Sequence, residues 1–116
     1  MSSINCIFCR IVSGEIQASK IYEDDLVIAF RDINPQAPKH ILIIPRNHVD
    51  SMNKMSAEDK DLVGHLLLAA SSIASQEGIA ETGYRTVINT GEDGGQTVWH
   101  LHVHLLGGRS LGWPPG

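Results

Sequence analysis

One long amphipathic segment constrains the fold of this chain more than any other feature. From about Ala57 to Glu77, apolar side chains recur at helical spacing and share one face: Leu62, Val63, Leu66, Leu67, Ala70, Ile73 and Ala74. Ser56 followed by Asp59 resembles a capping box with aspartate in the usual place of glutamate, and Gly78 is typical of a C-terminal cap. We therefore predict a helix over 57–77 that buries its apolar face against another layer of the fold.

The other apolar segments are short, and most of them predict strands. β-branched and aromatic residues, separated by turn residues, indicate strands at 19–23, 26–32, 41–44, 84–89 and 98–106. The segment 6–12 has helical spacing and ends at Ser13-Gly14, which predicts a short helix. The strands follow one another without repeated βαβ units. The sequence therefore predicts an α+β fold with about five antiparallel strands, a long helix and a short N-terminal helix.

Composition fits one small domain and argues against several classes of protein. The chain has 116 residues, 42% of them hydrophobic, which predicts a single domain over 1–116. A formal charge of −4 disfavours a broad electrostatic surface for nucleic acid. No apolar run approaches the roughly 20 residues of a membrane helix, and the N-terminus lacks a signal-peptide pattern. We expect no nucleic-acid partner, no membrane contact and a cytoplasmic location.

Three of the six histidines alternate with aliphatic residues at His100, His102 and His104. In a strand, alternate side chains face the same side, so this pattern predicts a row of imidazoles on one face and Leu101 and Val103 in the core on the other. Two kinds of chemistry use such a row. One is a transition-metal site built on neutral imidazoles, and the other is nucleophilic catalysis at phosphorus by an imidazole nitrogen.

The segment directly before the histidine row favours chemistry at phosphorus. Between Asn89 and Thr97 it supplies three glycines, a Gln amide, an Asn amide and two Thr hydroxyls. These groups donate hydrogen bonds of the kind that an anionic phosphoryl group accepts. A glycine-rich loop alone is usually only a turn, but its attachment to the histidine row strengthens the phosphoryl hypothesis.

At these residues the chain resembles the histidine triad family, whose pattern is His-φ-His-φ-His-φ-φ with φ hydrophobic. The run His100-Leu101-His102-Val103-His104-Leu105-Leu106 matches it at every position. The resemblance covers nearly the whole chain, and the ending looks like the Hint branch, the purine nucleoside phosphoramidases. The other matching segments are Ala29–Ile33, Pro35–Pro38, His40, Ile41–Pro45, Gly94–Gln96, Gly107–Arg109 and Trp113–Gly116.

The resemblance implies a nucleotidyl-enzyme mechanism. His102 matches the nucleophile, which attacks the α-phosphorus of a purine nucleoside 5′-phosphoramidate, and water then releases the nucleoside monophosphate from the imidazole. His104 matches a neighbour that contacts the phosphate, and His40 matches another histidine on the site side. His100 completes the catalytic set. No metal or other cofactor is expected to be required for the chemistry.

The resemblance also implies contacts to the nucleotide. Asp32 matches the residue that holds the ribose hydroxyls, although it could instead cap the turn before Asn34-Pro35. The phosphate cradle matches Asn89, Gln96, Thr97 and the amide of Gly95. The apolar slot for the purine matches Ile7, Phe8, Ile11, Phe30 and Ile33, any of which could instead be an ordinary core residue.

The resemblance further implies a homodimer whose sheets join across the interface. The tail 107–116 would contact the partner subunit, where Trp113 would reach the partner's nucleotide site. On the long helix, Leu68 points away from the apolar face, as a residue in a subunit contact would.

Cys6 and Cys9 lie too close together to close a long stabilising loop as a disulfide. A Cys-x2-Cys pair supplies two thiolates to tetrahedral zinc, with His48 and His100 as the candidates for the other two ligands. Members of the wider superfamily that carry this pair hold zinc in such a set. A redox pair and plain buried thiols are the alternatives. If zinc is bound, His100 is a ligand and not a catalyst.

Two other functions stay open at this point. One is a dinucleoside polyphosphate hydrolase, against which the ending Gly107–Gly116 argues. The other is a nucleotide-binding or zinc-binding interaction protein with vestigial activity.

Overall fold

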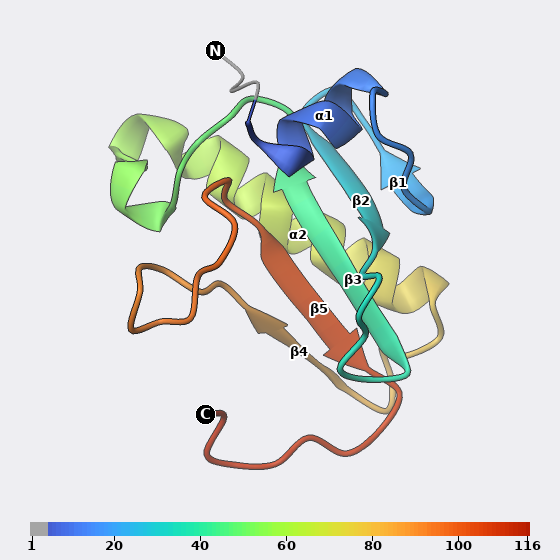
Figure 1. The fold of residues 1–116 in the computed structure, drawn as a ribbon. Coiled ribbons are helices and arrows are strands. Elements are labelled where there is room, and N and C mark those ends of the chain that lie inside the picture. The colour runs from blue at the N-terminus through green and yellow to red at the C-terminus, as the bar shows by residue number, and fades with distance from the viewer. Residues whose placement is uncertain (1–4) are drawn as a thin grey trace.

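The computed structural model describes residues 5–116 of the chain (Figure 1). Its elements in chain order are α1 (Ile7–Ser13), β1 (Lys20–Glu23), β2 (Val27–Arg31), β3 (Lys39–Pro45), 3-10 turns at Met52–Lys54 and Ala57–Asp59, α2 (Lys60–Gln76), β4 (Tyr84–Val87) and β5 (Val103–Gly107).

The five strands form one sheet in the order β1-β2-β3-β5-β4, and every neighbouring pair is antiparallel. β3 is central, and its register places Leu42 opposite His104 and Ile41 opposite Leu105. This arrangement confirms the α+β fold that the sequence predicts. It also brings the histidine segment at the end of the chain beside the β-branched run of β3.

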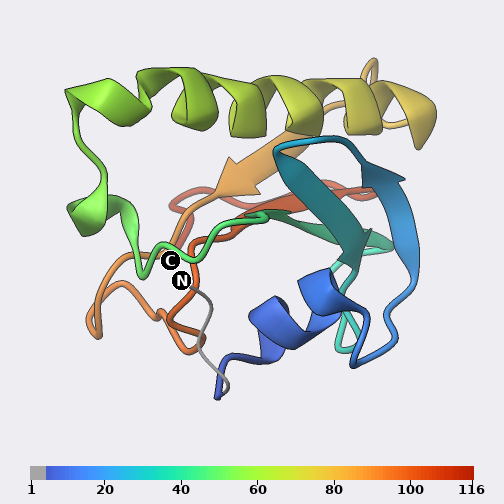
Figure 2. The same ribbon diagram turned by 90° about the horizontal axis from the view of Figure 1, so that it is seen from above.

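Helix α2 lies across one face of the sheet, as Figure 2 shows. The buried core on this face joins α2 to alternate residues of the strands: Val27, Ala29, Ile41, Ile43, Leu66, Ala69, Ala70, Ile73, Ala74, Ile79, Leu101, Val103 and Leu105. The capping box is present, because Ser56 N–H donates to Asp59 Oδ2 at 2.9 Å. The helix begins later than predicted because its first turn, Ala57–Asp59, is a 3-10 turn. Leu67, predicted on the buried face, is exposed together with Leu68.

Helix α1 packs on the opposite face (Figure 2). The strand residues that alternate with those facing α2 meet it there and form a second buried cluster: Cys6, Phe8, Cys9, Ile11, Ile28, Phe30, Leu42 and Ile44. The helix ends at Gly14, whose φ of 85° is the left-handed conformation that favours glycine.

The predicted strand over 98–106 is wrong at its start, because β5 begins at Val103. The ladder with β3 stops at the pair Ile43–Val103. Beyond it, Pro45 has no N–H to donate, and its carbonyl accepts a hydrogen bond from the His100 ring at 2.9 Å instead. The alternation still holds, because Leu101 is buried on the α2 side and its N–H donates to Val49 O at 2.7 Å. The predicted strand over 84–89 likewise ends early, at Val87.

Over residues 5–116, none of the helices combines the length and the apolar character that crossing a membrane requires.

Candidate active site

An apolar cavity of about 340 Å³ lies between α1 and the sheet. All five residues predicted for the purine slot line it, namely Ile7, Phe8, Ile11, Phe30 and Ile33. Ile33 is 99% exposed, so no core explains it. Sequence reasoning missed six further lining residues: Ile16, Gln17, Ala18, Arg31, Leu42 and Val98. Leu42 could have been found from the alternation along β3, which separates it from Ile41 and Ile43.

His102 is buried at the wall of this cavity, with the edge of the Phe8 ring against it. Its Nδ1 lies 2.8 Å from the carbonyl oxygen of His100. Because a carbonyl can only accept, Nδ1 carries the proton and Nε2 keeps its lone pair. Burial lowers the pKa of His102 below its ordinary value, which keeps the ring neutral at pH 7. His102 therefore has the form that a nucleophile requires.

His40 fixes the tautomer of His104. The Gln36 N–H donates to His40 Nδ1 at 3.0 Å, so the neutral His40 ring carries its proton on Nε2. That Nε2 lies 2.9 Å from His104 Nδ1, which therefore accepts, and the proton of His104 is on its Nε2. His104 lines the cavity, whereas His40 does not. Within the site, His40 is a positioning residue and His104 offers an N–H.

The histidines around the cavity are held neutral. Burial is the main cause that lowers the pKa of His104 to about 4, and the neighbouring His102 and His40 rings add to it, while Asp32 opposes it. Burial also lowers the pKa of His40, again opposed by Asp32. Neutral imidazoles can act as nucleophile and hydrogen-bond donor at pH 7.

His100, the third histidine of the row, lies apart from the cavity that His102 and His104 line. It is fully buried and lines neither the 340 Å³ cavity nor the cavity of about 470 Å³ that Cys6 and His48 line. Its backbone carbonyl holds His102, and its ring points to the two cysteines. The alternation of the triad places it beside His102, but its ring lies against the sulfur atoms of Cys6 and Cys9.

Asp32 lines the cavity and also caps a turn, so the capping interpretation is confirmed and the contact with the ribose stays a prediction. Its Oδ1 accepts from Asn34 N–H at 2.8 Å, and its Oδ2 lies 3.5 Å from His40 Nε2. Asp32, His40 and His104 are close enough for a metal ion. The hydrogen bond from Gln36 to Nδ1 leaves His40 Nε2 protonated, however, and a protonated nitrogen has no lone pair for a metal.

The glycine-rich loop uses most of its own donors. Gln96 Nε2 donates to Asp50 O at 2.7 Å and to Val98 O at 3.1 Å, so neither N–H of its amide is left for a phosphate. The Gly95 N–H donates to Glu92 O at 3.0 Å. The donors of Gln96 are therefore engaged by Asp50 and Val98, and that of Gly95 by Glu92, so a direct contact of either residue with a phosphate stays a prediction.

Two further residues of the expected nucleotide site lie away from the cavity, and one lines it. Thr97, the next residue after the loop, lines the cavity, whereas Asn89 does not. Trp113 is 82% exposed and does not line the cavity of its own chain, so its expected contact with the partner's site stays a prediction. The Arg85 guanidinium lies 5.9 Å from the Trp113 ring centroid and donates to Gly112 O at 2.7 Å, which holds this part of the tail near β4.

A second cluster of side chains could hold a metal ion. It contains Cys6, Cys9, His48 and His100, and Phe8 contacts the rings of both His100 in this cluster and His102 at the cavity. Cys6 Sγ lies 3.3 Å from His100 Nδ1, and Cys9 Sγ lies 3.3 Å from His48 Nδ1 and 3.6 Å from His100 Nδ1. Tetrahedral zinc with its usual bond lengths separates such ligand atoms by about 3.3–3.8 Å. The set therefore has the spacing of a closed structural zinc site.

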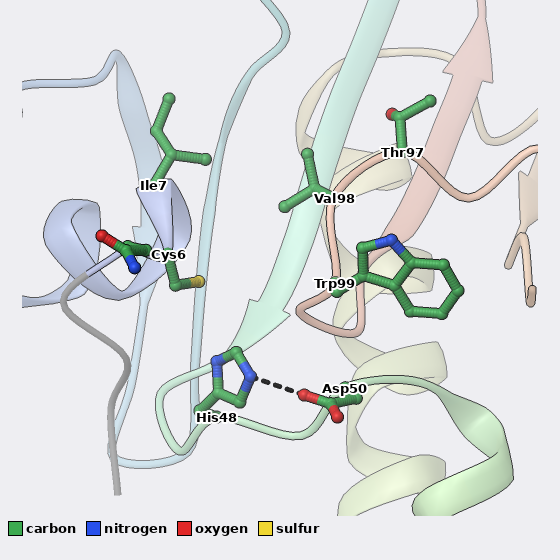
Figure 3. Close-up of a pocket in the computed structure, with 8 residues that line it drawn as sticks. Cys6, Ile7, His48, Asp50, Thr97, Val98 and Trp99 are labelled. Atoms are coloured by element: carbon green, nitrogen blue, oxygen red, sulfur yellow. Dashed lines mark hydrogen bonds and ion pairs between the residues drawn. The ribbon is translucent and has the colours of Figure 1, made fainter.

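The outer hydrogen bonds orient both imidazoles for a metal. His100 Nε2 donates to Pro45 O, and His48 Nε2 donates to Asp50 Oδ1 at 2.8 Å (Figure 3). Each bond fixes the proton on Nε2 and turns an Nδ1 lone pair toward the thiols, as at many metal-binding histidines. The donor set fits zinc, with two sulfur and two nitrogen ligands.

Comparison with known proteins identifies relatives over nearly the whole chain. A model of the HIT domain matches residues 13–111. The purine nucleoside phosphoramidase of Escherichia coli K12 is 55% identical over 106 residues, covering 91% of this chain and 89% of that protein. The 14 kDa zinc-binding protein of Zea mays is 53% identical over 112 residues, covering 95% of this chain and 87% of that protein. The crystal structure of a HIT family hydrolase from Legionella pneumophila superposes with a TM-score of 0.95 at 50% identity, covering 97% of this chain and 100% of that chain.

The fold, the histidine cluster beside an apolar cavity and these similarities lead to one assignment. The chain belongs to the HIT domain family.

Proposed function

We propose that the chain is a purine nucleoside phosphoramidase. It hydrolyses adenosine or guanosine 5′-phosphoramidates to the nucleoside monophosphate and an amine. The observation that carries the proposal is the pair of opposite tautomers at the cavity wall. His102 presents a lone pair on Nε2, and His104 presents an N–H on Nε2. A nucleophile and a proton donor side by side are what cleavage of a P–N bond requires.

In the first step, His102 Nε2 forms a bond to the α-phosphorus and the P–N bond breaks. The departing nitrogen leaves as the amine with a proton delivered through His104 Nε2. In the second step, water attacks the same phosphorus, the P–Nε2 bond breaks, and the proton of the water restores His104. One water is consumed, and the products are the nucleoside monophosphate and the free amine.

The cavity supports recognition of a purine nucleotide. Its apolar side chains suit the faces of a flat base, and the Asp32 carboxylate suits the ribose hydroxyls. Arg31 lines the cavity, but its guanidinium donates to both carboxylate oxygens of Glu77, at 2.8 and 3.1 Å. The phosphoryl oxygens are therefore held by neutral donors, Thr97 and His104.

The proposal includes a structural zinc ion, held by Cys6, Cys9, His48 and His100. Zinc would cross-link α1 to the segments that carry the two histidines, and the two chemical steps do not involve it. The proposal adds that residues 1–116 are one domain and that the active form is a homodimer. Among the described residues, β4 pairs with β5 on one side only, and Leu67 and Leu68 are exposed on α2, which supports an interface across this edge.

The test is steady-state hydrolysis of adenosine 5′-phosphoramidate by the wild type and by His102→Gly, each with and without a chelator, with diadenosine tetraphosphate run beside it. His65→Gln is the control, because His65 lies on α2 and does not line the cavity. We expect turnover that chelator and His65→Gln preserve and His102→Gly abolishes. Preferential cleavage of diadenosine tetraphosphate would contradict the proposal, as would turnover of neither nucleotide.

A further inference from the structure

A second cavity, of about 470 Å³, lies beside the first and is not used by the mechanism above (Figure 3). We propose that it is the leaving-group site and that it selects amines carrying a second, cationic group such as an ammonium. This proposal rests on the proposed phosphoramidase function, because only a substrate with an amine substituent has a part that could enter this cavity.

The two cavities share a wall. Ile7, Thr97 and Val98 line both of them. A nucleotide held in the first cavity has its phosphoryl group near Thr97 in the proposed mechanism. A flexible substituent on that phosphorus can therefore cross the shared wall and enter the second cavity. The lining of the first cavity is mostly apolar, which disfavours placing a charged arm there.

The lining of the second cavity favours a cation. Figure 3 shows Asp50 and Trp99 on the same side of the cavity, facing Cys6 and Ile7 across it. One oxygen of Asp50 accepts from His48 Nε2, and the carboxylate is 52% exposed, so it can accept further hydrogen bonds from a ligand. Neither Lys nor Arg lines this cavity among the described residues, so no permanently charged cation there offsets the charge of Asp50.

Trp99 adds a second feature that suits a cation. The residue is 50% exposed at the cavity and belongs to neither buried cluster, so packing does not account for it. The face of an indole attracts ammonium and guanidinium groups, and a carboxylate nearby strengthens that attraction. Together the two side chains form a site for an arm that ends in a positive charge.

The experiment compares three substrates: unsubstituted adenosine 5′-phosphoramidate, its N-(5-aminopentyl) derivative and its N-hexyl derivative. The last two have arms of equal length that differ in terminal charge. We expect the wild type to favour the aminopentyl substrate over the hexyl one by about tenfold in kcat/KM, the size of a cation–π contact combined with one partly screened carboxylate.

Two variants locate the selectivity. Asp50→Asn keeps an oxygen that can accept the hydrogen bond from His48. It should bring the ratio of kcat/KM for the aminopentyl substrate to that for the hexyl substrate close to one. Trp99→Ala should lower kcat/KM for both armed substrates. Trp99→Ala should keep activity on the unsubstituted substrate within about twofold of the wild type. For Asp50→Asn, which alters the partner of His48, the ratio between the two armed substrates is measured within the variant, so that a change in overall activity cancels.

Equal kcat/KM for the two arms in the wild type would overturn the proposal. An equal loss on all three substrates would also overturn it, because it would assign Asp50 and Trp99 to support of the metal centre or the fold. The affinities of the same compounds for His102→Gly, measured by calorimetry, separate this proposal from the proposed function. Selective binding of the ammonium arm without turnover of any substrate in the wild type would refute the phosphoramidase and keep the cation site.

Discussion

Acid should destabilise this protein through its buried histidines, and His104 allows the size of the effect to be worked out. The folded-state pKa of His104 is about 4, against an ordinary value of 6.5. Below pH 6.5 the unfolded chain therefore binds a proton that the folded chain refuses until about pH 4. Stability rises with pH wherever the unfolded state binds more protons, so the stabilisation present at pH 7 is lost as the pH falls from 6.5 to 4.

Between pH 7 and pH 5, the two pKa values give a loss of about 2 kcal/mol in the free energy of unfolding from this residue alone. In urea titrations with a slope of about 2 kcal/mol per molar, the loss moves the midpoint by about 1 M. The wild type should lose more stability over this interval than His104→Gln, by an amount near that figure. A His104→Gln variant with the full wild-type loss would refute the reasoning, as would an NMR titration that places the His104 midpoint at 6.5.

Three further predictions concern activity. Since burial lowers the pKa of His102, the half-maximal point on the acid side of the pH–activity profile should lie below the ordinary histidine value of 6.5; a half-maximal rate at or above pH 6.5 would contradict this. Asp32→Ala should raise the Kd for adenosine monophosphate about tenfold with kcat within about threefold, as loss of a ribose hydrogen bond predicts, and calorimetry with an unchanged Kd would remove Asp32 from the site. Gly94→Ala should lower both melting temperature and activity, since its Cβ would lie 2.9 Å from Thr90 N and closer still to Thr90 O; a wild-type melting curve would show that the loop adapts.

Local patterns in the sequence predict most of the fold. The apolar periodicity of 57–77 predicts α2, and the β-branched run 41–44 predicts β3, because each pattern reflects how one element meets the core. The start of β5 could not be predicted in this way. It depends on Pro45, about sixty positions earlier in the chain, which ends the ladder by offering a carbonyl to a side chain.

The candidate site was likewise predictable in its residues but not in its hydrogen bonds. The sequence predicts the residues of the histidine triad and, through the family resemblance, those of the apolar slot. Which of their atoms are available depends on distant partners. The side-chain amide of Gln96 donates both its hydrogen bonds to Asp50 and Val98, and the ring of His100 points to the cysteines. The amino-acid sequence alone shows neither of these contacts.

The first turn of α1 interleaves two sites within four residues. Cys6 and Cys9 belong to the donor set that fits a metal, while Ile7 and Phe8, between them, line the 340 Å³ cavity proposed for the nucleotide. If one ligand orders this turn, the other ligand binds with a smaller loss of conformational entropy. Metal and nucleotide should therefore show positive cooperativity, and linkage requires the factor by which zinc tightens nucleotide binding to equal the factor by which nucleotide tightens zinc binding.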